Sequence, residues 1–211
     1  YSVLFETDRL CRKIQNTDIT IENWEKQRAI QERKDTEKNL LKLGISTFFL
    51  NRTNYSGVIN GGVIGGLTQE GSYKIDCRFN KTELIQRIKL VAAHKENIRL
   101  ENLDALTLVQ KIKKDKNTIF YFDPPYYLKG PSLYMNHYKH DDHKRVSEEI
   151  RKIQNARWIV SYDDVSEIQD LYAGVQKIDY SFNHSVRTPR IGRESIFCSN
   201  NISLFDILDP V

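Results

Sequence analysis

The chain has 211 residues, with 39% apolar and 28% charged side chains and a formal net charge of +4 at pH 7. This length can bury a sizeable core, the composition is that of an ordinary globular protein, and no apolar run reaches the 18 residues needed to cross a bilayer. The mild positive charge does not by itself argue for a nucleic-acid partner, and three widely separated cysteines fit a reducing compartment and no metal site.

The first 50 residues predict helices. Apolar side chains near the start of the chain recur with helical spacing, and Thr20 is a candidate cap for the next helix. Residues 24–38 are charged and almost free of apolar side chains, so their helix should lie on the surface. Residues 40–50 are rich in Leu, Ile and Phe and predict a buried helix.

Residues 51–79 are rich in Gly, Asn, Thr and Ser and predict a loop with a short hairpin. Arg52, Asn54 and Tyr55 have groups that can reach bases or phosphates, because Arg suits guanine edges and Asn suits adenine edges. The alternative is that Asn51 and Arg52 hold the loop together internally. For Arg52 we favour proximity to DNA, and for Asn51 both interpretations stay open.

Residues 80–211 predict an alternation of strands and helices. Asn80 is a candidate helix cap, with Glu83 three residues later. Strands are predicted at residues 98–100, 119–122, 158–161, 175–182 and 194–199, the last two forming a hairpin, and further helices at residues 103–112, 141–154 and 165–172. This order predicts an α/β fold with a mostly parallel sheet between helices. The chain therefore divides into a helical and loop region at 1–79 and an α/β region at 80–211.

Three histidines, His137, His140 and His143, lie three residues apart and raise the question of zinc. No cysteine or acidic cluster completes a tetrahedral set unless Asp141 or Asp142 is added. A solvated loop and helix start is the favoured interpretation, so we expect no metal.

The sequence Asp123-Pro124-Pro125-Tyr126 follows the apolar strand at 119–122. The two prolines end that strand and stiffen the turn, which places an acid and an aromatic ring at the carboxyl end of a strand, where open α/β sheets bind ligands. A carboxylate from Asp123 and the carbonyl of Pro124 can each accept one hydrogen of an exocyclic base amine, which frees the nitrogen lone pair for attack. Tyr126 can stack on a base rotated out of the duplex. The alternative is a simple strand-terminating turn.

Several segments resemble one family in the order in which the family has them. Besides DPPY, these are FFLNRTNYSG at residues 48–57, IRLENLDA at 98–105, WIVSYD at 158–163 and GRESI at 192–196. The chain thus resembles the Dam-like (D12 class) N6-adenine DNA methyltransferases. The resemblance implies a Rossmann-like S-adenosylmethionine-dependent methyltransferase sheet with a helical target-recognition insertion, in which 1–79 is the target-recognition region and 80–211 the C-terminal part of the catalytic domain.

The resemblance also implies a set of site residues and partners. Asp104 and Ala105, with Asp123, would border the cofactor S-adenosylmethionine, although Asp104 could equally cap the helix that begins at Ala105. Lys129 and Tyr138 lie in the long loop after the motif and are candidate DNA contacts. We expect a monomeric cytoplasmic enzyme of bacterial or phage origin that methylates double-stranded DNA within restriction–modification or genome marking, with a cognate restriction endonuclease as a candidate partner.

One family element has no counterpart here. The glycine-rich FxGxG segment, which holds the methionine end of the cofactor, should precede residue 51, whereas the glycines at 61–66 come too late in the order. We expect that the chain lacks part of its amino terminus. Two alternatives therefore stay open, namely a catalytically incomplete DNA-binding remnant and an enzyme of the same fold that methylates N4 of cytosine or RNA.

Overall fold

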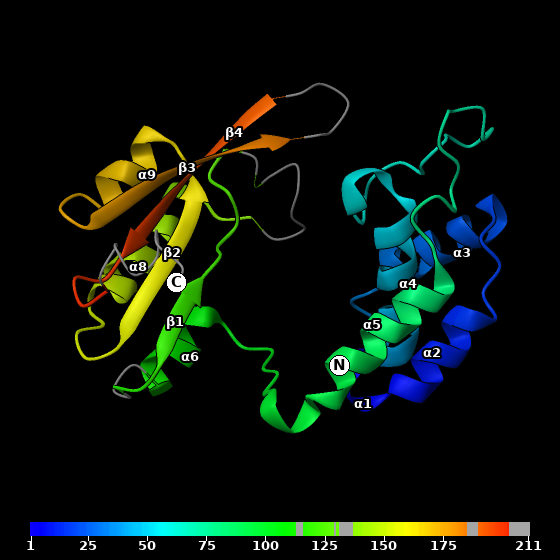
Figure 1. Ribbon diagram of the computed structural model, residues 1–211, viewed down its shortest axis with the longest axis horizontal. Helices are drawn as coiled ribbons and strands as arrows, with labels where there is room; N and C mark the ends of the chain where they lie inside the picture. The colour runs from blue at the N-terminus through cyan, green and yellow to red at the C-terminus, as the bar shows by residue number, and fades with distance from the viewer. Residues whose placement is uncertain (113–115, 129, 131–136, 185–189, 203–211) are drawn as a thin grey trace. The chain divides into compact units, whose positions relative to one another are not determined.

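The computed structural model describes residues 1–112, 116–128, 130, 137–184 and 190–202. The chain forms two compact units, Tyr1–Glu101 and Asn102–Val211, which follow one another from blue through green to red in Figure 1.

The first unit is helical. Its helices are α1 (Ser2–Phe5), α2 (Thr7–Gln15), α3 (Ile21–Glu32), α4 (Leu40–Thr53) and α5 (Lys81–Ala93), with 3-10 turns at Tyr55–Gly57 and Lys95–Asn97. Two predicted caps are confirmed, because the Asn23 amide donates to the Thr20 hydroxyl at 3.2 Å and the Glu83 amide donates to Asn80 Oδ1 at 3.2 Å. Such caps satisfy backbone donors that have no partner within the helix.

The core of the first unit is formed by apolar side chains from α2, α3, α4, α5 and the loop that follows α4. The buried members are Leu10, Cys11, Ile14, Trp24, Leu41, Phe49, Leu50, Val63, Ile75, Phe79, Leu84 and Ile88. In the loop, a single antiparallel bridge joins Asn54 and Val63 where a short hairpin was predicted.

The division between the units lies later in the chain than the predicted boundary at 79/80. Helix α5 packs against α1 and α2, and its Leu84 and Ile88 belong to the first core. Residues 98–100 form no strand, and Leu100 is 54% exposed. Structurally, residues 80–101 are therefore part of the helical unit, because the apolar face of α5 is buried there.

The second unit contains a four-stranded mixed sheet in the order β1-β2-β4-β3. The strands are β1 (Ile119–Phe122), β2 (Arg157–Asp163), β3 (Gln176–His184) and β4 (Arg190–Cys198). The β1–β2 pair is parallel, whereas β4 runs antiparallel to both β2 and β3. The predicted closing hairpin is thus confirmed, but the sheet is less parallel than expected because the hairpin returns β4 between β2 and β3.

Helices α6 (Ala105–Ile112), α8 (His140–Arg151) and α9 (Ser166–Leu171) lie on one side of this sheet (Figure 1). Alternate strand residues, including Phe120, Trp158, Val160 and Tyr162, pack with these helices in the second core. The intervening residue Tyr121 is 64% exposed, so β1 is buried on one face only, although its sequence is apolar throughout. Its odd-numbered side chains point to the opposite face, and they continue into the DPPY turn.

The described residues contain neither a candidate membrane-spanning helix nor a candidate metal-binding group of side chains. None of the helices in these ranges has the length and apolar character needed to span a bilayer. Within the same ranges, no three or more His, Cys, Asp or Glu side chains are grouped so that they could hold a metal ion.

Candidate active site and DNA-contacting residues

Asp123 lies directly after β1, on the face of the sheet opposite the helices. Because Phe122 pairs with Val160 in parallel register, the next residues on the two strands, Asp123 and Ser161, are neighbours. The Ser161 hydroxyl lies 3.4 Å from Asp123 Oδ1 and 3.0 Å from the Tyr121 hydroxyl. Asp123 is exposed, and within the described residues its Oδ2 has no hydrogen-bond partner. The carboxylate is therefore held at one oxygen while the other is free to accept.

The turn after the motif is held by a second carboxylate. Asp163, at the end of β2 and two residues beyond Ser161, accepts from the Tyr127 amide at 2.7 Å and from the Leu128 amide at 3.0 Å. Hydrogen bonds to a charged acceptor are about twice as strong as neutral ones. Asp163 thus fixes the backbone immediately after Pro125 and Tyr126.

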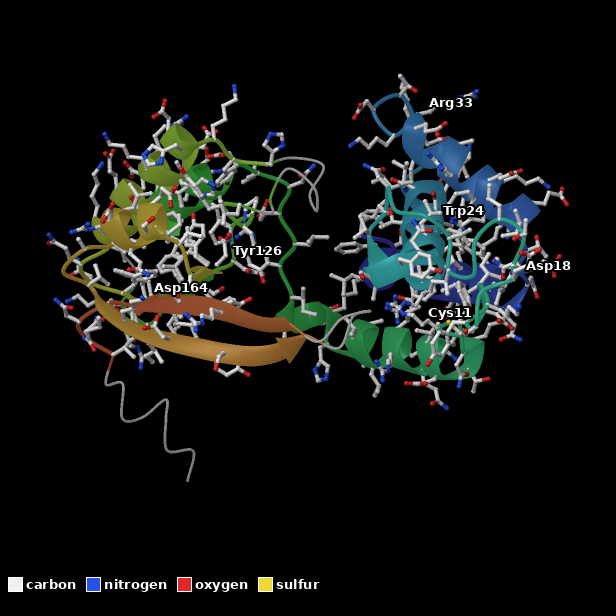
Figure 2. All side chains as sticks on the ribbon, turned by 90° about the horizontal axis from the view of Figure 1, so that it is seen from above. Cys11, Asp18, Trp24, Arg33, Tyr126 and Asp164 are labelled. Carbon is white, nitrogen blue, oxygen red and sulfur yellow. The ribbon has the colours of Figure 1, made fainter. Side chains whose placement is uncertain are left out.

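A third carboxylate contacts the aromatic residue of the motif. The Tyr126 hydroxyl donates to Glu194 Oε1 at 2.5 Å, and Glu194 on β4 is paired across the sheet with Asp163 on β2. Two acidic residues at one cross-strand position therefore bind the side chain of Tyr126 and the backbone that follows it. Figure 2 labels Tyr126 within the second unit.

Neither carboxylate was assigned this role from the sequence. Glu194 and Asp163 were each only part of a segment that resembles the family. The position of Asp163 at the end of a strand parallel to β1 was a usable signal. The position of Glu194 was not, because it depends on β4 entering the sheet beside β2.

Aromatic and imidazole rings pack beneath the turn. His143 of α8 is fully buried, its Nδ1 lies 3.0 Å from the Tyr162 hydroxyl, and its ring lies 5.1 Å from the ring of Tyr127 and 5.3 Å from that of Tyr138. Burial lowers the pKa of His143, although the carboxylates of Asp163 and Asp142 act in the opposite direction. A neutral imidazole thus supports the rings on either side of the long loop.

The comparison with known families decides the identity. The sequence profile of the D12 class N6 adenine-specific DNA methyltransferases matches residues 6–184, which include most of the first unit and the second unit as far as the end of β3, with the DPPY turn. The chain belongs to this family. It is therefore a DNA methyltransferase specific for N6 of adenine, and methyltransferases generally use S-adenosylmethionine as the methyl donor. None of the curated proteins matches the chain.

Asp104 of the methyltransferase caps α6, which was one of its two predicted roles. Its Oδ1 accepts from the Thr107 amide at 3.1 Å, and Ala105 is the first residue of the helix. Asp104 is exposed, and it lies close enough to Tyr138 to contribute, after burial, to the raised pKa of that phenol. Contact of Asp104 and Ala105 with the cofactor stays a prediction.

The predicted DNA contacts of the first unit separate into an interior residue and surface residues. Asn54 is fully buried and uses its whole side chain internally: Oδ1 accepts from the Trp24 indole at 2.6 Å, and Nδ2 donates to the carbonyls of Val58 and Ile59 at 2.8 and 2.9 Å. Figure 2 labels Trp24 among the helices of this unit. No polar atom of Asn54 is left for a base in this conformation.

Arg52 is half-buried at the end of α4 and has arginine neighbours. Its Nε donates to Asn51 Oδ1 at 3.3 Å, and Arg78 Nη1 donates to the Asn54 carbonyl at 3.4 Å. The pKa of Arg52 is lowered, first by burial and then by the like charges of Arg78 and Arg87. Arg78 and Arg87 are therefore close enough to Arg52 for their charges to act on it.

Three more predicted contacts have different surroundings. Tyr55 is 49% exposed, and its hydroxyl accepts from the Gly65 amide at 3.2 Å. Tyr138 is half-buried against His143. Lys129 lies outside the described residues. Asn51, for which both interpretations were open, donates from Nδ2 to the Gly57 carbonyl at 3.1 Å and so holds the loop.

Proposed function

We propose that this chain methylates N6 of adenine in double-stranded DNA by direct transfer, with the DPPY turn as the polarising element. The free Oδ2 of Asp123 and the carbonyl of Pro124 would each accept one N–H of the target amine. The observation that supports this most directly is the state of Asp123, which is exposed at a strand end, held at Oδ1 by Ser161 and unpartnered at Oδ2 among the described residues.

The donor S-adenosylmethionine would supply an electrophilic methyl carbon bound to a sulfonium sulfur. As the two acceptors draw the amine hydrogens toward them, the N6 lone pair localises and can attack in line with the carbon–sulfur bond. The new carbon–nitrogen bond would form as the carbon–sulfur bond breaks, the electron pair of that bond would stay on the sulfur as a neutral thioether, and one N6 proton would pass to solvent. The protein supplies positioning and polarisation, which lower the barrier without a covalent enzyme intermediate.

The chain offers groups that suit the cofactor at the edge of a Rossmann-like sheet. β1 and β2 are parallel, and ligands of open α/β sheets bind beyond the carboxyl ends of such strands. Asp104 uses Oδ1 for the helix cap, and its Oδ2 has no hydrogen-bond partner among the described residues, so it could accept from an exocyclic amine of the cofactor's adenine. We assign this contact to Asp104, with Ala105 and Asp123 beside it.

Asp163 and Glu194 would act as positioning residues. The Asp163 carboxylate holds the amides of Tyr127 and Leu128, and Glu194 holds the hydroxyl of Tyr126. A ring fixed at its hydroxyl presents its face in one orientation, which suits stacking on an extruded base. Neither carboxylate needs to touch the substrate in this role.

On the DNA side, Arg52 and its neighbour Arg78 would contact phosphate or a guanine edge, because both have guanidinium N–H groups that no described residue binds. Tyr55 would contact the duplex through its exposed ring. Tyr138 and Lys129 remain candidates from the long loop. Asn54 is not included, because its amide is fully used inside the unit.

The test is methyl transfer from labelled S-adenosylmethionine to unmethylated genomic DNA by the Asp123→Ala and Asp123→Asn variants. We expect transfer to be lost in Asp123→Ala and reduced at least a hundredfold in Asp123→Asn, with DNA affinity unchanged in both. Asp170→Ala is the matched control, because Asp170 is an exposed carboxylate on α9. Nucleoside analysis of the product should give N6-methyladenine, and wild-type turnover in Asp123→Ala would remove this residue from the mechanism.

A further inference from the structure

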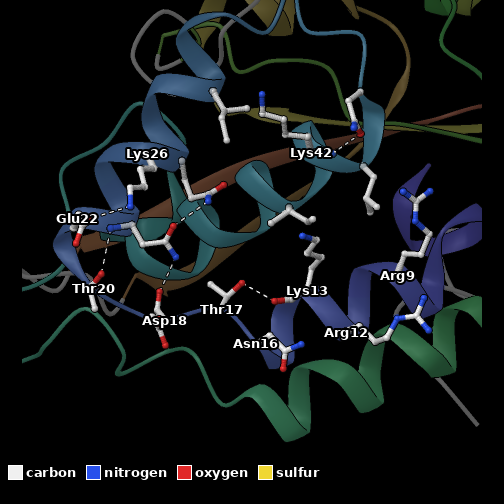
Figure 3. Close-up of a pocket in the computed structure, with 16 residues that line it drawn as sticks. Arg9, Arg12, Lys13, Asn16, Thr17, Asp18, Thr20, Glu22, Lys26 and Lys42 are labelled. Carbon is white, nitrogen blue, oxygen red and sulfur yellow. Dashed lines mark hydrogen bonds and ion pairs between the residues drawn. The ribbon is translucent and has the colours of Figure 1, made fainter.

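A polar groove of about 880 Å³ lies between α2, α3 and α4 of the first unit (Figure 3). The groove lies within the region that the resemblance assigns to target recognition, but none of its lining residues was given a role, and no residue named above as a DNA contact borders it. The inference drawn from it rests on the proposed function, because it concerns how the methyltransferase holds its DNA.

Helix α2 presents one basic and polar face to the groove. Its lining residues follow the spacing i, i+3, i+4, i+7: Arg9, Arg12, Lys13 and Asn16. The other face of the helix, with Leu10, Cys11 and Ile14, is buried in the core. A helix with one buried apolar face and one polar face is typical of a protein surface. The polar, solvent-facing side of α2 therefore forms this wall of the groove.

Helices α3 and α4 complete the groove with polar, basic and apolar side chains, and two acidic residues, Asp18 and Glu22, also line it, so that its five cations outnumber its two carboxylates. The lining residues of α3 again follow the spacing i, i+3, i+4, i+7, and those of α4 and its cap continue the wall: Asn23, Lys26, Gln27 and Ile30, then Asn39, Lys42 and Ile45. Each of the three helices thus places at least one cation in the same groove.

The cations of the groove are not all paired. Arg9 pairs with Glu6 at 2.9 Å, Lys26 with Glu22 at 2.6 Å and Lys42 with Glu37 at 2.5 Å. Arg12 and Lys13 are exposed, and within the described part of the chain they have no ion pair or hydrogen bond through their charged groups. Exposed ion pairs contribute little stability, so the three paired cations can also turn toward an incoming anion at small cost.

Two helices also begin at this groove. Thr20 caps α3 and Asn39 caps α4, and both border it. The amino-terminal ends of these 12- and 14-residue helices carry partial positive charge from the aligned peptide dipoles. This charge adds to that of Arg12 and Lys13 and has the same sign.

We propose that this groove binds the phosphodiester backbone of the DNA duplex. The cations are spread over three helices, which suits successive phosphates of a strand better than a single small anion. Such contacts fix the orientation of a protein on DNA without reading its sequence, and they leave base contacts to other residues. The groove would therefore contribute affinity and register to the enzyme, while the DPPY turn provides the chemistry.

The test is the salt dependence of duplex binding, measured by fluorescence anisotropy for the whole chain without cofactor. The variant Arg12→Ala/Lys13→Ala should lower the slope of log K against log salt by about 1 to 2, since each phosphate contact contributes about 0.9. The loss should be equal for duplexes of different sequence. Both side chains are exposed and Ala favours helix, so we expect the variant to fold, which circular dichroism would check.

Lys144→Ala/Arg157→Ala is the control, because it removes the same two kinds of exposed cation from the second unit. A slope in Arg12→Ala/Lys13→Ala equal to that of wild type would overturn the proposal. A groove that binds inorganic phosphate at millimolar concentration, with an unchanged duplex slope, would also overturn it in favour of a free-anion site. Asp123 does not line the groove, so Asp123→Ala should keep the wild-type slope. The catalytic proposal is tested by methyl transfer in Asp123→Ala, and the groove proposal by the salt slope in Arg12→Ala/Lys13→Ala, so either one can fail without the other.

Discussion

The hydroxyl of Tyr126 donates a hydrogen bond to Glu194 Oε1 at 2.5 Å, across 68 residues of sequence. Glu194 lies opposite Asp163 in the sheet, and Asp163 holds the two amides that follow Tyr126. The aromatic residue of the motif is therefore fixed both through its side chain and through the backbone after it.

The Tyr126–Glu194 hydrogen bond should contribute to methyl transfer as a single unit. We expect Tyr126→Phe and Glu194→Ala each to lower kcat about tenfold, which corresponds to about 1.4 kcal/mol and is close to the lower end of the range for a hydrogen bond to a charged group. The double variant should be no slower than the slower single variant, because both changes remove the same contact. Multiplicative losses, measured with labelled S-adenosylmethionine, would contradict the coupling.

The stability of the turn after the motif should depend on how many amide hydrogen bonds the side chain at position 163 can accept. Asp163→Ala leaves the Tyr127 and Leu128 amides without their acceptor and should lower the free energy of unfolding by about 1–3 kcal/mol. Asp163→Asn keeps one carbonyl oxygen and should lie between Ala and wild type. Urea unfolding measures the stability, and DNA affinity serves as the control. Equal stability of all three proteins would show that the turn does not depend on this carboxylate.

Burial of His143 should make stability depend on pH in the weakly acidic range. Its pKa is lowered in the folded state, so the unfolded chain takes up a proton at a higher pH than the folded chain does. The contribution of neutral His143 to the free energy of unfolding is fully present above the pKa of the unfolded chain, near 6.5. It is lost as the pH falls from there through the pKa of the folded protein. Three charged groups near this ring also act on its pKa. The carboxylates of Asp163 and Asp142 reduce the downward shift, whereas His140 adds to it.

The measurement is the free energy of unfolding between pH 7.5 and 5 for wild type and His143→Gln. Wild type should lose more stability than the variant over this interval, because the variant has no imidazole to protonate. The variant will be less stable at every pH, since it alters the contact with Tyr162, so the difference in slope is the diagnostic quantity. Parallel curves would place the acid sensitivity elsewhere.

Asn54 and Arg52 should respond in opposite ways to substitution. Asn54→Ala removes the acceptor of the buried Trp24 indole and the donor to two carbonyls, so it should cost about 3 kcal/mol of stability. Arg52→Ala should change stability by about 0.5 kcal/mol or less and weaken DNA binding instead. Urea unfolding and duplex anisotropy together assign each residue. A stable Asn54→Ala variant with weak DNA binding would restore Asn54 to the interface.

The sequence by itself determined the features that depend on neighbours along the chain. The caps at Thr20, Asn80 and Asp104 were predictable, since a side chain three residues before an amide binds it whatever the rest of the fold does. The DPPY turn was predictable for the same reason, because two prolines end a strand wherever it lies. The family profile over residues 6–184 agrees with the resemblance drawn from these local motifs.

The tertiary structure alone decided the contacts that join distant segments. β4 enters the sheet between β2 and β3, and this position brings Glu194 to Tyr126, which no spacing along the chain indicated. The packing of α3 against α4 buries Asn54, a residue whose polar side chain predicted exposure. Register and burial follow from the sum of long-range packing and hydrogen bonding, so residue type predicts which groups are present but not which of them meet.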